Sequence, residues 1–292
     1  MTPTWPMSAP DRWSTLLRRL PDWIRRWLVR PGLARPAAIP EALWQQVLRD
    51  LPCLAGLSHE ETIGLQALCA RFLADKEFHG ARGLAVSDAM ALAVTAQACL
   101  PLLYWGPDAL DCYDDFVGIV LHADEVLAPR EALDAAGVLH HWREPLIGEA
   151  MASGPVMLAW SHVRGDRRAQ TQGHNLVIHE FAHKLDLRGK PAGTPANGCP
   201  QLPVNFMGLK RSSARQRWQQ DWSAAYADFR AQLALAERFG QPAPWLDPYA
   251  AQAPAEFFAC ACEAYWVARE RFALEFPPLA TLLDAFFRRP PR

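Results

Sequence analysis

The segment Asn175–Asp186 reads N-L-V-I-H-E-F-A-H-K-L-D, and apolar residues surround its few polar ones. Read with a helical period, it has no continuously polar side, which is typical of a helix buried inside a protein. His179, Glu180 and His183 stand at its centre. Because a carboxylate loses free energy when water is removed from it, buried glutamates are rare unless another group pairs with them. The segment therefore predicts a buried helix and partners for three polar side chains.

The residues from His179 to His183 form the pattern H-E-x-x-H. Four residues of a helix turn through about 400°, so the two imidazoles lie about 40° apart and can bind one ion. Neutral imidazole suits Zn²⁺, and a neighbouring carboxylate can take a proton from water. The pattern predicts a zinc site with His179 and His183 as ligands and Glu180 as general base. A surface helix without metal is the alternative, and it would need a polar face that this segment lacks.

A third metal ligand must come from another part of the chain. The longer pattern H-E-x-x-H-x-x-G-x-x-H fails, since Asp186 and Gly189 stand where it requires glycine and histidine. A glutamate from a later helix remains, as in sites built from two histidines and one glutamate. Glu256 lies in 253–266, which reads as a second buried helix, and is the predicted ligand. Its alternative role is to complement the helix dipole from the first turn.

Two further acids have open interpretations. Glu263 follows Glu256 by two helical turns and lies on the same face, so it either orients a ligand histidine or makes an ordinary buried hydrogen bond. Asp186 follows His183 by three residues. It either orients a ligand histidine through the free imidazole N–H or ends the helix before Gly189.

Composition narrows the class of protein. A net charge of −1 gives no support for bulk affinity for nucleic acid or membranes. The seven cysteines include no C-x-x-C pair, which favours a reduced intracellular protein over a disulfide scaffold. The first forty residues lack the apolar core of a secretory signal, and the longest uncharged run, 89–105, is shorter than a membrane span. We expect a cytoplasmic protein that does not bind nucleic acid directly.

The chain divides into an N-terminal extension and one domain. Residues 1–38 are rich in Trp, Arg and Pro and read as a poorly ordered extension, although 13–29 could form a basic amphipathic helix that contacts a membrane or a partner. Residues 39–292 read as a single domain. The expected helices are 40–51, 58–76, 87–100, 175–186, 212–239, 254–271 and 278–287, and the expected strands are 116–121 and 155–160.

The motifs resemble those of the Mlc titration factor A (MtfA) family of zinc peptidases. Asn175–Asp186 and Asp247–Ala259, the latter reading D-P-Y-A-A-Q-A-P-A-E-F-F-A, carry the resemblance, which runs from about Ile39 to Phe287. The spacing from Tyr249 to Glu256 is also similar to that of a more distant gluzincin-type peptidase, the catalytic domain of anthrax lethal factor. The resemblance implies a mainly helical α+β fold, zincin-like, with a small mixed sheet whose edge strand lies beside the H-E-x-x-H helix.

The resemblance also implies roles for single residues. His179, His183 and Glu256 match the zinc ligands, Glu180 matches the catalytic base, and Tyr249 matches a tyrosine thought to aid the transition state. In peptidases of this type an edge strand pairs with an extended peptide substrate. We expect Pro155–Trp160 to be that strand, with an interior strand as the alternative.

Two functions remain from the sequence. The first is zinc-dependent, aminopeptidase-like hydrolysis of peptides or proteins by one Zn²⁺ per chain, with Glu180 activating water and Tyr249 assisting. The second is a regulatory protein that sequesters a transcription factor and whose zinc site is structural or incidental. The resemblance implies an Mlc-like sugar-uptake repressor as a partner, and the region 189–245 is a candidate cover for the cleft.

Overall fold

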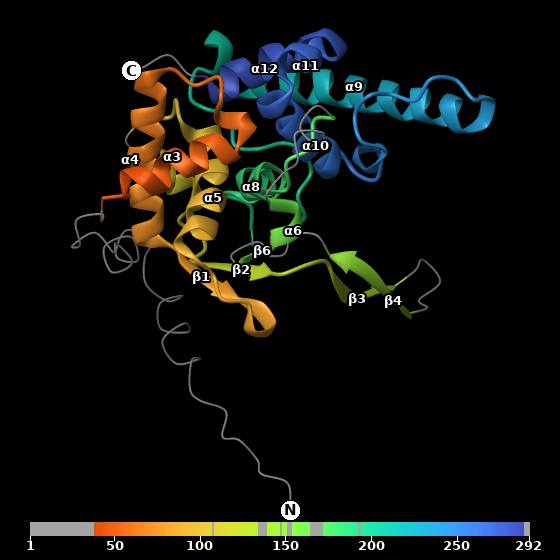
Figure 1. Ribbon diagram of the computed structural model, residues 1–292. Coiled ribbons are helices and arrows are strands. Elements are labelled where there is room, and N and C mark those ends of the chain that lie inside the picture. Colours follow the sequence, from red (N-terminus) through yellow and green to blue (C-terminus); the bar gives the residue numbers. More distant parts are fainter. Residues whose placement is uncertain are drawn as a thin grey trace, which may run out of the picture. The chain divides into compact units, whose positions relative to one another are not determined.

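The computed structural model describes residues 38–106, 108–133, 139–146, 148–150, 154–163, 172–191 and 194–288 (Figure 1). The predictions for residues 1–37, including the amphipathic segment 13–29, lie outside the described residues. Within the described part, no helix combines the length and the apolar character needed to cross a membrane.

Helices make up most of the described chain, as expected for a mainly helical α+β protein. Their bounds are α3 Glu41–Asp50, α4 His59–Asp75, α5 Asp88–Cys99, α6 Trp160–Val163, α8 Leu176–Leu187, α9 Arg211–Phe239, α10 Pro254–Val267, α11 Arg269–Glu275 and α12 Pro277–Phe287. The start of α4 shows a reciprocal cap. Ser58 Oγ accepts from the Glu61 N–H at 3.2 Å, and the Glu61 carboxylate accepts from the Ser58 N–H at 2.8 Å.

The predicted helix 254–271 is two helices. Helix α10 ends at Val267, Ala268 leaves the helical conformation with φ −140° and ψ 47°, and α11 starts at Arg269. The turn at Ala268 brings the rings of Tyr265 and Phe272 into contact, with 6.1 Å between their centroids. This aromatic contact accompanies the break between the two helices.

A four-stranded sheet lies beside α8 (Figure 1). Its order is β1-β2-β6-β5, with bounds β1 Glu77–Gly80, β2 Gly118–His122, β6 Val156–Ala159 and β5 Gly148–Ala150. The first three strands are parallel and β5 is antiparallel to β6. Strands β3 Val126–Leu133 and β4 Leu139–Leu146 form a separate antiparallel pair.

The expectation that Pro155–Trp160 forms the edge strand is wrong. Strand β6 pairs with β2 on one side and with β5 on the other, and the chain turns into α6 at Trp160. Val156, Leu158 and Ala159 are buried, as is usual for an interior strand. The edge strand that contacts α8 is β5, whose three residues Gly-Glu-Ala have no strand-like pattern in the sequence.

Helix α8 lies inside the domain and packs against α5, α10 and β5. Phe181, on the side of α8 that carries no metal-binding residue, contacts Tyr113 at a centroid distance of 4.9 Å, together with Phe72 and Phe116. The predicted burial of this helix is therefore confirmed, and His179 and Glu180 are 9% and 4% exposed.

Candidate metal centre

The start of α8 is fixed by a buried polar network. Asn175 caps the helix, since its Oδ1 accepts from the Ile178 N–H at 2.9 Å. The Asn175 amide donates to Gln97 Oε1 at 2.8 Å, and Gln97 donates to the Ala93 carbonyl at 2.9 Å within α5. Because each of these polar groups has a partner, the first turn of α8 is held at a defined position against α5.

Three predicted ligand atoms converge between α8 and α10. The Nε2 atoms of His179 and His183 lie 3.1 Å apart, and Oε2 of Glu256 lies 3.2 Å from the first and 3.3 Å from the second. Ligands bonded to Zn²⁺ at 2.0–2.1 Å in a tetrahedron stand about 3.3 Å from one another. The residues present thus fit a zinc ion by both donor type and spacing.

Glu263 supports the histidine on the opposite side of the ring. His179 Nδ1 donates to Glu263 Oε1 at 2.6 Å, and the other oxygen of Glu263 accepts from the backbone N–H of Asn175. Donation from Nδ1 fixes the ring so that Nε2 faces Glu256 and His183, and it is Nε2 that would bind a metal ion in place of a proton. Of the two interpretations of Glu263, the geometry supports orientation of His179.

The charges of this cluster depend on each other. Burial alone would lower the pKa of His179, but Glu263, Cys260 and Glu256 outweigh it and raise that pKa well above its usual value. Burial alone would raise the pKa of Glu256, yet hydrogen bonds from His179 and His183 hold it far below its usual range. The atoms that share a proton in this cluster are the same ones that a metal ion would bind, because protons and metal ions compete for the same lone pairs.

Glu180 is buried beside these ligands without sharing their hydrogen bonds. Burial raises the pKa of its carboxyl to about 7, against the opposing effect of His179 and His183. Its Oε2 has no hydrogen-bond partner among the described residues. A buried, unpartnered carboxylate oxygen is costly in a purely structural position, and such groups are concentrated at functional sites.

Gly148 of β5 provides the space for this carboxylate. A Cβ built at residue 148 would lie 2.3 Å from Glu180 Oε1 and 2.7 Å from its Cδ. Only glycine therefore lets the edge strand approach Glu180 this closely. The sequence analysis missed Gly148, because no local pattern marks a glycine whose neighbour is a side chain 32 residues away.

Tyr249 lies at the open side of the cluster. It belongs to the 3₁₀ turn Pro248–Ala251, where Asp247 Oδ1 accepts from its N–H at 2.8 Å. Its ring centroid is 6.1 Å from that of His179, and its side chain is 43% exposed. Burial of part of the ring, with Glu256 nearby, raises the pKa of its phenol to about 12, so the hydroxyl keeps its proton at neutral pH.

Asp186 turns away from the ligands, and the structure supports its interpretation as a helix-end residue. Its two oxygens accept from the backbone N–H groups of Asn197, Gly198 and Cys199 at 2.8, 2.7 and 3.1 Å, and Lys190 Nζ lies 2.6 Å from Oδ1. None of these partners is a histidine. The acid ties the segment after α8 to the helix.

The described part of region 189–245 leaves the cluster partly open. The side chains of His183 and Glu256 are 12% and 20% exposed.

Cys260, one turn after Glu256, also has its thiol close to His179 and Glu263, and burial raises the pKa of this thiol to about 12. The spacing of Glu256, Cys260 and Glu263 along α10 was the signal in the sequence that places all three on one face.

Comparisons with known proteins identify a family of metallopeptidases. The model of the family described as glucose-regulated metallo-peptidase M90 matches residues 23–288, which starts before the Ile39 expected from the motifs. Mlc titration factor A of Escherichia coli O9:H4 (strain HS) is 31% identical over 265 residues, 91% of each chain. The protein of the same name from Klebsiella pneumoniae is 32% identical over 251 residues, covering 86% of this chain and 87% of the relative.

Proposed function

The chain belongs to the M90 family of glucose-regulated metallopeptidases, and we propose that it is a zinc-dependent, aminopeptidase-like enzyme. The observation that carries the proposal is the convergence of His179, His183 and Glu256 at 3.1–3.3 Å with Glu180 buried beside them. We propose these three residues as ligands of one zinc ion, which when bound would polarise a peptide carbonyl and acidify water.

The chain's own residues supply the proton transfers. Glu180 takes a proton from the attacking water and passes it to the leaving amine. Its pKa of about 7 lets the carboxyl group be ionised when it accepts this proton and neutral when it donates it. Tyr249 keeps its phenolic proton and donates a hydrogen bond to the oxygen that becomes negative in the transition state. Glu263 holds the His179 ring in the orientation that the ligand role needs.

We propose that β5 binds the peptide substrate. One side of β5 pairs with β6, and no strand among the described residues pairs with the other. An extended peptide can add to such an edge through backbone hydrogen bonds. Gly148 places this edge in contact with Glu180, so a peptide on β5 would pass the catalytic carboxylate.

The relatives' name points to a partner as well. Proteins called Mlc titration factor A match along most of this chain, so an Mlc-like sugar-uptake repressor is a proposed partner or substrate, with the cytoplasm as the proposed location. The alternative, a sequestering protein with an incidental zinc site, leaves the unpartnered, buried oxygen of Glu180 without a role. That observation favours the enzyme.

Elemental analysis and one isosteric substitution test the proposal. Protein purified without chelator or a histidine tag should contain about one zinc per chain. Glu180→Gln should retain that zinc while peptide hydrolysis falls at least about 1000-fold, since the variant lacks the general base. Wild-type protein that neither contains nor takes up zinc would end the peptidase interpretation, and full activity in Glu180→Gln would end the assigned role of Glu180.

A further inference from the structure

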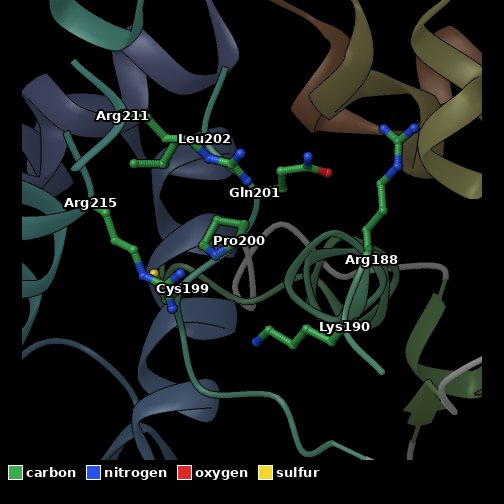
Figure 2. Close-up of a pocket in the computed structure, with 9 residues that line it drawn as sticks. Arg188, Lys190, Cys199, Pro200, Gln201, Leu202, Arg211 and Arg215 are labelled. Carbon is green, nitrogen blue, oxygen red and sulfur yellow. The ribbon is translucent and has the colours of Figure 1, made fainter. Parts of the chain in front are cut away.

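A second concave site lies beyond the C-terminal end of α8 and shares no residue with the metal centre. It is a cavity of about 180 Å³ between the segment after α8 and the start of α9. Its lining residues are Arg188, Gly189, Lys190, Cys199, Pro200, Gln201, Leu202, Arg211 and Arg215. Figure 2 shows Lys190 approaching it from the end of α8 and Arg211 and Arg215 from the opposite wall.

The charged residues that line this cavity are all cations. Four of the nine lining residues are cations and none is an acid. Two of the four are already engaged: Arg188 runs away from the cavity (Figure 2) and contacts Cys112 Sγ at 2.7 Å, and Lys190 is paired with Asp186 and hydrogen-bonded to Asn197. The remaining cations, Arg211 and Arg215, determine what the cavity attracts.

Arg211 and Arg215 have no ion pair or hydrogen bond within the part of the chain that the structure describes. Arg217 on the same helix shows the usual arrangement, with its Nε 2.6 Å from Asp221. Like charges four residues apart on a helix destabilise it by about 0.2–0.5 kcal/mol. Both residues are exposed to solvent, and with no acidic partner on this wall of the cavity their charges are available to a bound anion.

Their position on α9 adds a second source of positive potential. The 29-residue helix begins at Arg211, has no acid in its first turn and has no side-chain cap from Lys210. The N-terminal end of a helix carries a partial positive charge and exposes N–H groups without intrahelical acceptors. Acidic residues normally occupy this end, whereas here basic ones do, and an oxyanion would satisfy both the dipole and the guanidinium groups.

We propose that this cavity binds the phosphate group of a phosphate monoester, with Arg211 and Arg215 as its main contacts. A phosphate monoester carries close to two negative charges and offers several acceptor oxygens, so it can bind two guanidinium groups at once. A single carboxylate has only two oxygens and can pair fully with one guanidinium group. Gln201 and Lys190 are further donors at the rim. The volume holds a phosphate group with a few waters, so the rest of the ligand would extend outside.

Calorimetric titration with inorganic phosphate at constant ionic strength tests the proposal. Arg211→Gln/Arg215→Gln should weaken phosphate binding at least tenfold, while Arg238→Gln, an exposed arginine at the other end of α9, should leave it unchanged. Since phosphate also coordinates zinc, the titration is repeated on Glu256→Ala, where binding should persist. Thermal unfolding of each variant establishes that the fold is intact.

Three results would overturn the proposal: no phosphate binding above that of acetate, unchanged binding in Arg211→Gln/Arg215→Gln, or loss of binding in Glu256→Ala. A second set of titrations, with glycerol phosphate and with a phosphoserine peptide, distinguishes a small metabolite from a phosphorylated protein. Both molecules contain a phosphate monoester, and the one that binds more tightly identifies the source of the ligand. These results do not depend on peptidase activity, so they separate this site from the proposed function.

Discussion

Two pairs of polar side chains on α8 differ in how far their hydrogen-bonding groups are satisfied: Lys184 and Asp186 on the one hand, Glu180 and His183 on the other. Lys184 donates to the Gly154 carbonyl at 3.1 Å and lies over the Phe116 ring at 4.3 Å, and Asp186 accepts three backbone N–H groups. By contrast, Glu180 keeps one oxygen and His183 keeps Nδ1 without a hydrogen-bond partner in the described part of the chain.

This difference separates a structural pair of residues, Lys184 and Asp186, from a chemical pair, Glu180 and His183. Satisfied buried charges hold neighbouring segments in place, and losing one partner destabilises the fold. Unsatisfied ones cost stability and persist where a ligand or a reacting group completes them. Substitutions in the two pairs should therefore give different results, those of Lys184 and Asp186 changing folding and those of Glu180 and His183 changing metal binding or rate.

Glu256→Ala should have the largest effect, because it removes one of three ligands on the chemical side. We expect zinc affinity to fall at least about 1000-fold, equivalent to about 4 kcal/mol, with hydrolysis lost at ordinary zinc concentrations. Competition with a chromogenic chelator measures the affinity. Glu237→Ala, an exposed acid on α9, is the matched control and should bind zinc as the wild type does. Equal affinities in all three proteins would exclude Glu256 as a ligand.

Asp186→Asn tests the structural side. The amide has one acceptor oxygen in place of two and no charge for Lys190, so the free energy of unfolding should fall by about 2–4 kcal/mol. Urea denaturation measures this change. Zinc bound per folded chain should stay the same. If the variant instead unfolded like the wild type but lost zinc, the assignment of Asp186 to the structural pair would be wrong.

Gly148→Ala tests the contact between the edge strand and Glu180. The added methyl group must displace the carboxylate or the strand, so we expect kcat to fall about 100-fold with zinc content unchanged. Gly118→Ala is the matched control in the same sheet, where the new Cβ would have ordinary contact at 3.6 Å with Pro155. Similar steady-state rates for both variants would show that Glu180 does not need the space at residue 148.

Tyr249→Phe should have the smallest effect. Loss of the phenolic hydroxyl removes one hydrogen bond to the developing oxyanion while the ring remains beside His179, so kcat should fall about 10- to 30-fold and KM should change little. Steady-state kinetics on a peptide substrate measure both constants. A rise in KM with an unchanged kcat would indicate that Tyr249 binds substrate and does not act on the transition state.

Much of the site could be predicted because its signals are local. The spacing of His179 and His183, the apolar residues around them and the buried helix that contains Glu256 are each readable within one segment. The resemblance to the MtfA family rests on the same segments and is confirmed by the family match and the relatives. The mainly helical α+β fold followed from it.

The buried H-E-x-x-H helix and the candidate ligands could thus be predicted without coordinates, because helical periodicity encodes burial and facing over a few turns. Folding in three dimensions was needed to show that β5 is the edge strand, that Gly148 adjoins Glu180, and that Asp186 binds a loop while Glu263 orients His179. These features depend on partners far away in the chain, such as Glu263 and Asn175, which lie 88 residues apart. A three-residue strand or a lone acid has no local pattern, so its role follows only from the neighbours that folding provides.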